Sequence, residues 1–177
     1  MSIGPEHRQA VRNETVVSVA INSLVPAAII WFLDASPPQT LIGDAAIVRS
    51  MLPAAGLATL LMTLVLTNIV RFRVRKGALP ALDWPAAERG AMAWIPKPLI
   101  LRAIALALLA LVLLVPAGLG VVALIDILPL TKAGFLIFNL VYGAMVGLVM
   151  ARFVVLPALA DPVKPGLIKH DPAKARA

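Results

Sequence analysis

The chain has 177 residues, of which 60% are hydrophobic and only 14% are charged, whereas a soluble domain carries roughly a quarter charged residues. So much apolar surface is more than a soluble domain of this length needs to bury, and the composition predicts a membrane protein. The net charge of +7 does not indicate a nucleic-acid binder, because the basic residues stand in short segments between apolar runs. Without cysteine, disulfides, thiolate metal sites and thiol redox chemistry are excluded.

Four long apolar runs predict four transmembrane helices, and therefore an all-α, polytopic four-helix bundle. The shortest run has 18 residues and would be about 27 Å long as a helix, close to the roughly 30 Å of a hydrocarbon core. This first run follows two arginines, as a signal peptide would, but it exceeds the usual apolar region of about 7–15 residues. We therefore take it as a helix, and the predicted helices cover residues 16–33, 51–70, 99–125 and 134–156.

The connections between the runs are rich in residues that interrupt helices. Pro37 and Pro38 break the first connection, and four prolines stand in the segment 71–98. That segment is expected to be a basic, proline-rich loop. Within it, residues 84–92 predict a short interfacial helix with Asp83 as the N-cap.

Lysine and arginine are distributed very unevenly between the two sides of this predicted bundle. An even number of helices places the tails 1–15 and 157–177 on the same side as the loop 71–98. This side, including the nearby helix ends, carries fourteen of the basic residues, and the other side carries only Arg49 and Lys132. Because basic flanks stay in the cytoplasm, we expect both termini to be cytoplasmic and the protein to lie in a bacterial inner membrane.

Two short similarities suggest that the chain contains a repeated helical hairpin. Leu24–Ala28 resembles Leu114–Gly118, and the second and fourth runs both end in an Arg-Phe pair, at Arg71 and Arg152. Such repeats would be related by an axis along the membrane normal. Chance resemblance in a sequence rich in Leu, Val, Ala and Pro is the other explanation.

The last predicted helix has a stripe of small or hydrogen-bonding side chains at every fourth position. Small residues let another helix backbone come close, so the stripe predicts a packing interface. The interface could join this helix to a partner or a second copy, or to another helix of the same chain. The stripe consists of Asn139, Gly143, Gly147 and Ala151.

Polar side chains gather in the cytoplasmic halves of the first two predicted helices. They could line a small cleft open to the cytoplasm, or they could serve only as hydrogen bonds that hold the two helices together. The residues concerned are Ser18, Asn22, Thr63, Thr67 and Asn68.

A belt of basic residues marks the cytoplasmic ends of the predicted helices. Such cations attract anionic lipid headgroups, although orientation in the membrane alone also requires them. The belt consists of Arg71, Arg73, Arg75, Lys76, Arg102 and Arg152.

The predicted membrane region lacks the residues that most transporters and membrane enzymes need. No Asp, Glu, Lys or His stands near its middle, which argues against an ion-driven transporter and against membrane hydrolases. We expect no enzymatic activity, no cofactor and no metal. The sequence favours an accessory or scaffold subunit that binds anionic membrane lipid and packs against itself or a larger membrane complex. The alternative is a small permease for a neutral or weakly polar solute.

Overall fold

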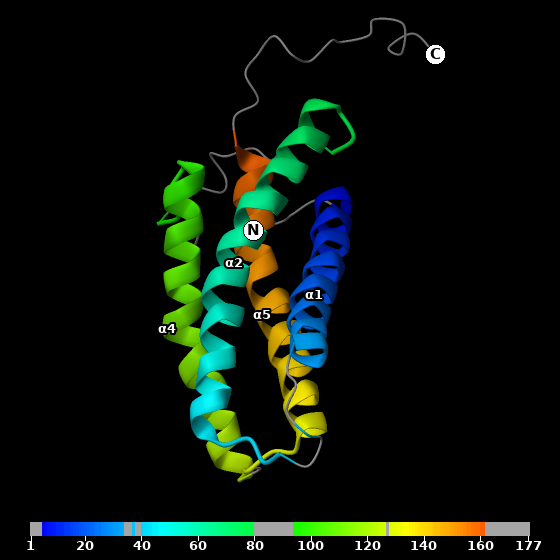
Figure 1. Cartoon of the computed structure of the whole chain (residues 1–177). Coiled ribbons are helices and arrows are strands. Elements are labelled where there is room, and N and C mark those ends of the chain that lie inside the picture. Colours follow the sequence, from blue (N-terminus) through cyan, green and yellow to red (C-terminus); the bar gives the residue numbers. More distant parts are fainter. Residues whose placement is uncertain (1–4, 34–36, 38–39, 80–93, 127, 162–177) are drawn as a thin grey trace, which may run out of the picture.

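The computed structural model of the protein describes residues 5–33, 37, 40–79, 94–126 and 128–161. This part of the chain is all-α and contains no strand, only one isolated bridge. Four helices lie side by side, and each runs opposite to the one before it in the sequence (Figure 1). Each is long and apolar enough to cross a membrane. They are α1 (Pro5–Leu33), α2 (Asp44–Arg75), α4 (Leu99–Ile125) and α5 (Lys132–Ala160).

The interfacial helix expected at residues 84–92 lies outside the described residues, and so do the basic residues of the tail from 162 onward.

Three of the helices extend beyond the apolar runs that predict them. α1 begins with proline, which suits the first turn of a helix, and α5 begins after Thr131, whose hydroxyl accepts a 3.2 Å hydrogen bond from the amide of Gly134. α2 begins at Asp44, where a carboxylate favours the positive end of the helix dipole. Because α2 starts early, Pro53 lies inside this helix and not in its first turn.

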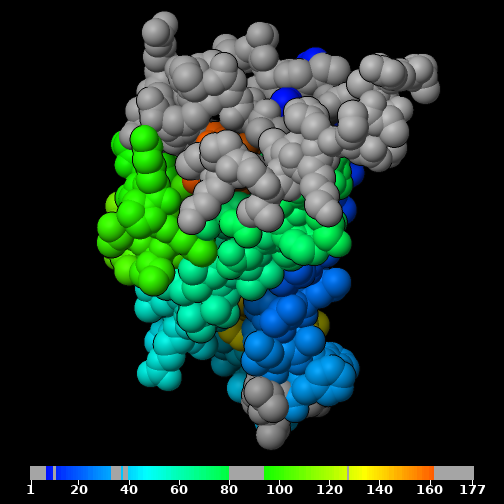
Figure 2. All heavy atoms as spheres, turned by 90° about the horizontal axis from the view of Figure 1, so that it is seen from above, coloured from blue at the N-terminus to red at the C-terminus, as the bar shows by residue number. Residues whose placement is uncertain are grey.

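Helices that follow each other in the sequence are not the main packing partners. α1 packs along α5, and α2 packs along α4, while α2 and α5 meet in the middle. The pairs α1/α2 and α4/α5 touch at few places. Figure 2, which looks down from the top of Figure 1, shows α4 and α1 on opposite sides with the end of α2 between them. The fold is therefore two antiparallel helix pairs joined through α2 and α5.

The two ends of the molecule differ in character. At the end that we call the basic end, α2 finishes with Arg71, Arg73 and Arg75. At the opposite end, which we call the bridge end, Ile42 and Leu130 exchange backbone hydrogen bonds of 2.8 and 3.0 Å between the two short connections. The first hairpin is α1 and α2, and the second is α4 and α5. Each helix of one hairpin packs mainly on a helix of the other, which we call the exchanged pairing. Together with the reciprocal bridge, this is the pattern that a two-fold axis between the two hairpins would give.

The surface of the described helices is apolar and their interior contains polar groups. On α1, Val17, Ile21 and Trp31 are exposed, whereas Glu14 and Ser18 are buried. On α4, Leu124 exposes 86% of its surface, and similar exposed apolar side chains occur on all four helices. A protein folded in water shows the opposite distribution. The buried apolar core lies mainly between α2, α4 and α5 and includes Ile47, Met51, Val70, Leu106, Ala110, Val146, Met150 and Val154.

Candidate functional site

The stripe of small residues on α5 lies inside the molecule, against α1. A Cβ atom on Gly143 would overlap the carbonyl oxygen of Asn22, and one on Gly147 would lie 2.9 Å from the carbonyl oxygen of Ser18. Both glycines therefore allow the backbones of α1 and α5 to touch. The remaining members of the stripe, Asn139 and Ala151, are buried as well.

Two of the predicted cleft residues, Ser18 and Asn22, lie at the contact between α1 and α2. The Nδ2 atom of Asn22 donates to the Ser18 carbonyl oxygen at 2.8 Å and to the sulfur of Met62 at 3.3 Å. The hydroxyl of Ser18 also donates to the Met62 sulfur. Both side chains are at most 3% exposed, so in this conformation they are closed to solvent and act as a polar contact between the two helices.

The polar residues of α2 do not all face the same way. Thr63 and Thr67 are fully buried, together with Thr59, which the sequence analysis did not single out. The Thr63 hydroxyl donates to the Thr59 carbonyl oxygen at 2.8 Å. Asn68 is exposed and donates to the Leu64 carbonyl oxygen of its own helix. The structure thus separates Asn68 from the other residues of the predicted cleft.

A buried cluster of charges joins three helices at the basic end. Arg102, only 1% exposed, donates from Nη1 and Nη2 to the two carboxylate oxygens of Asp161 at 2.9 and 2.8 Å. Arg71 contacts the same carboxylate at 2.8 Å. Arg102 also donates to the carbonyl oxygens of Pro96 and Lys97, at 3.2 and 3.3 Å. This two-arginine clamp ties the end of α5 to α2, to α4 and to the loop before α4.

The basic belt predicted from the sequence is divided between internal and surface roles. Arg71 and Arg102 serve the clamp on Asp161, and Arg73 forms an ion pair with Glu14, a buried residue of α1. Arg73 is itself about half exposed, and three other members of the belt are exposed as well. They are Arg75, Lys76, which stacks over the ring of Phe72, and Arg152.

The two acidic partners, Glu14 and Asp161, were missed because both lie in segments that read as polar tails. The signal that could have found them is positional. Glu14 stands two residues before the first apolar run and Asp161 five residues after the last one, both on the predicted side of the molecule where the arginines gather. A buried arginine needs a counter-charge, and few acidic residues lie close enough to supply one.

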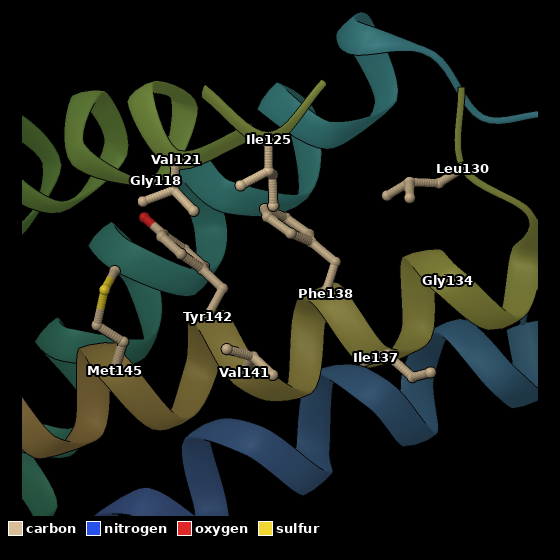
Figure 3. A pocket seen from close by; sticks show the side chains of 10 residues that line it. All are labelled: Gly118, Val121, Ile125, Leu130, Gly134, Ile137, Phe138, Val141, Tyr142 and Met145. Carbon is tan, nitrogen blue, oxygen red and sulfur yellow. The ribbon is translucent and has the colours of Figure 1, made fainter. Parts of the chain in front are cut away.

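An apolar pocket of about 370 Å³ lies between α4 and α5 in the half of the molecule near the bridge end. Val121, Ile125, Ile137 and Val141 line it and are exposed, so they form its rim. Tyr142 lies at its inner wall, with its hydroxyl directed toward α4 (Figure 3). The remaining lining residues are Gly118, Leu130, Gly134, Phe138 and Met145.

Neither metal ligation nor similarity to known proteins assigns a function. Within the described residues, no group of three or more His, Asp or Glu side chains could hold a metal ion. The chain matches no protein-family model, no curated protein and no solved structure.

Proposed function

We propose that the chain is a multi-pass protein of a bacterial inner membrane with both termini in the cytoplasm. Its role there is that of a non-enzymatic accessory or scaffold subunit. The basic end binds anionic lipid headgroups of the inner leaflet, and the transmembrane surface packs against a larger membrane complex or a second copy.

The observation that carries the membrane placement is the inverted surface. Glu14, Ser18 and Asn22 are buried on α1 while its outward face is apolar. In water this arrangement would expose apolar side chains and bury polar ones, both of which are unfavourable. In a bilayer the same arrangement is stable, because lipid chains cover the apolar faces and polar groups pair between helices.

The lipid-binding part of the proposal rests on the exposed cations at the basic end. Arg75, Lys76 and Arg152 are exposed there, and each cation near an anionic membrane surface adds about 1 kcal/mol of attraction. The stripe on α5 is occupied by α1 and is unavailable to a partner while that contact persists. A partner would therefore bind another apolar face of the molecule.

The orientation is tested with single cysteines, which the cysteine-free chain makes unambiguous. Arg49 and Arg75 are exposed at opposite ends of α2. In intact bacterial cells, we expect a membrane-impermeant maleimide to label an Arg49→Cys variant, and to label an Arg75→Cys variant only after lysis. Labelling of both variants in intact cells, or the reverse pattern, would reject the proposed orientation.

Lipid binding is tested in phosphatidylcholine nanodiscs titrated with phosphatidylglycerol, with bound lipid counted by native mass spectrometry. Replacing Arg75, Lys76 and Arg152 together by glutamine is expected to weaken phosphatidylglycerol binding about a hundredfold, from about 1 kcal/mol per charge. Arg49→Gln at the bridge end is the matched control and should have no effect. Equal losses in both variants would argue against headgroup binding at the basic end.

A small permease is the second candidate, and one observation favours it. The hydroxyls of Ser23, Thr59 and Thr67 are buried without a hydrogen-bond partner among the described residues, as in a path that water or a solute fills in another conformation. A Ser18→Cys variant separates the two functions. The permease requires this cysteine to react with a small water-soluble maleimide, whereas the accessory role leaves it protected.

A further inference from the structure

The pocket between α4 and α5 has the size and lining of a site for one hydrocarbon chain. We propose that it binds a neutral single-chain lipid, and that one oxygen atom of this lipid accepts a hydrogen bond from the hydroxyl of Tyr142. This site lies in the half of the molecule away from the basic end, so it is distinct from the headgroup binding proposed above.

The volume of the pocket decides what kind of apolar group can enter. About 370 Å³ lies within the usual range of small-molecule sites, roughly 300–1,000 Å³. At about 30 Å³ per water-sized group, the pocket holds a chain of roughly twelve such groups, too few for both chains of a phospholipid.

The polarity of the pocket selects a neutral ligand with one oxygen atom. Tyr142 is 3% exposed, and its hydroxyl has no hydrogen-bond partner within the described part of the chain. A buried donor without an acceptor is costly, and a ligand oxygen would relieve that cost. The residues that line the pocket include no charged side chain, so nothing there favours an ionic headgroup.

Neighbouring residues hold the tyrosine ring in the position that this role requires. A Cβ atom on Gly118 would lie 2.8 Å from the ring of Tyr142, so glycine is what allows the ring to lie against α4. On its own helix the ring stacks on that of Phe138, with centroids 5.9 Å apart and planes inclined by 8°. The hydroxyl is thereby held against α4 beside the pocket (Figure 3). It is buried in this conformation, and a ligand oxygen reaches it when a lining side chain moves aside.

The entrance lies where lipids would be available. Val121 and Val141 form part of the rim and are about half exposed or more, so the pocket opens sideways onto the apolar surface of α4 and α5. The site depends on the proposed membrane placement for its supply of ligand, but not on the accessory role or on the basic belt. Failure of one proposal can therefore be told from failure of the other.

The probe is a twelve-carbon primary alcohol that carries a photoreactive diazirine at the end of its chain. It is added to the full chain in phosphatidylcholine nanodiscs, irradiated, and the labelled peptides are mapped by mass spectrometry. We expect saturable labelling of α4 and α5 near the rim, for example at Val121 or Val141. Unlabelled 1-dodecanol should compete roughly three- to tenfold better than dodecane, because only the alcohol offers an oxygen to Tyr142.

Three variants locate the site. Val121→Phe fills the pocket and should abolish saturable labelling. Val112→Phe, at another exposed valine of α4 that does not line the pocket, is the matched control and should label as the wild type does. Tyr142→Phe removes only the hydroxyl and should weaken competition by 1-dodecanol roughly three- to tenfold, the range expected for one hydrogen bond, while dodecane is unaffected.

Several results would overturn the proposal. Labelling that does not saturate, or that survives in Val121→Phe, would mean that the probe only samples the bilayer surface of the protein. Equal competition by alcohol and alkane, unchanged in Tyr142→Phe, would mean that the hydroxyl does not recognise the ligand. If the chain does not enter nanodiscs at all, the membrane placement fails first, and that outcome is visible before any labelling.

Discussion

The carboxylate of Asp161 is the counter-charge of an arginine that has almost no access to solvent. Asp161→Asn leaves the guanidinium of Arg102 buried beside a neutral amide, and removing one partner of a buried ion pair costs roughly 3–5 kcal/mol. We expect this loss in the free energy of unfolding, measured by denaturant titration in a mild detergent. Arg75→Gln, which changes an exposed cation, should shift it by less than about 0.5 kcal/mol.

A paired replacement distinguishes a charge effect from a packing effect at the same place. Arg102→Met with Asp161→Leu removes both charges and keeps similar volume, and such exchanges are often neutral or stabilising. Arg71, which is about a quarter exposed, can then be solvated. A double variant less stable than Asp161→Asn alone would show that the clamp contributes mainly through shape.

For single residues, the sequence predicts which side chains form polar contacts better than it predicts their partners. The arginines at the helix ends stand out in the sequence, but the choice of Asp161 as their shared partner depends on how α2, α4 and α5 meet. Periodicity within one helix carries no information about that meeting. The same limit explains why Ser18 and Asn22 contact Met62 and not the polar residues of α2.

Among the helices, the contact between α1 and α5 depends on two glycines. Gly143→Leu would force a side chain into the backbone of α1, and we expect a loss of at least about 3 kcal/mol in the free energy of unfolding, at the upper end of overpacking effects. Amide hydrogen exchange should show the loss first in α1, which has few contacts with any other helix.

The matched control is Gly120→Leu on α4. A Cβ atom there meets nothing within 4 Å, and replacing an exposed helical glycine can gain up to about 1 kcal/mol. Equal destabilisation by both leucines would mean that any larger side chain destabilises these helices. The close approach of the α1 and α5 backbones at Gly143 would then not be the cause.

The helices themselves were largely predictable, whereas their ends and their pairing were not. Hydropathy predicts four long helices because a membrane-spanning helix must be apolar over about 20 residues, and the ends predicted for α4 agree with the structure. The other helices continue into polar residues, since helix propagation does not require apolar side chains. Pairing depends on surfaces that come from distant parts of the chain, which explains why α1 packs on α5.

For the molecule as a whole, the exchanged pairing predicts how two halves of the chain would behave. A break within residues 80–93 separates α1 and α2 from α4 and α5, yet each main helix pair has one member in each half. We expect the two fragments, co-expressed in bacteria, to co-purify as a complex that unfolds cooperatively. Each fragment alone should be rapidly degraded, because its two helices touch at few places.

The control for this experiment places Gly143→Leu in the second fragment, which contains α4 and α5. It should lower recovery of the first fragment several-fold, whereas Gly120→Leu should not. Fragments that are each stable alone and do not associate would contradict the exchanged pairing.

The same pairing imposes an order on biosynthesis. When α1 leaves the ribosome, its main partner is still roughly a hundred residues away in the messenger, a delay of about 5–20 s at ordinary rates of synthesis. During that time α1 can meet only α2, through Glu14 with Arg73 and through Ser18 and Asn22 with Met62, and its close backbone contact with Gly143 and Gly147 of α5 is still missing. A product that stops before α5 leaves the face of α1 that packs on α5 uncovered, which is the kind of defect that membrane proteases recognise.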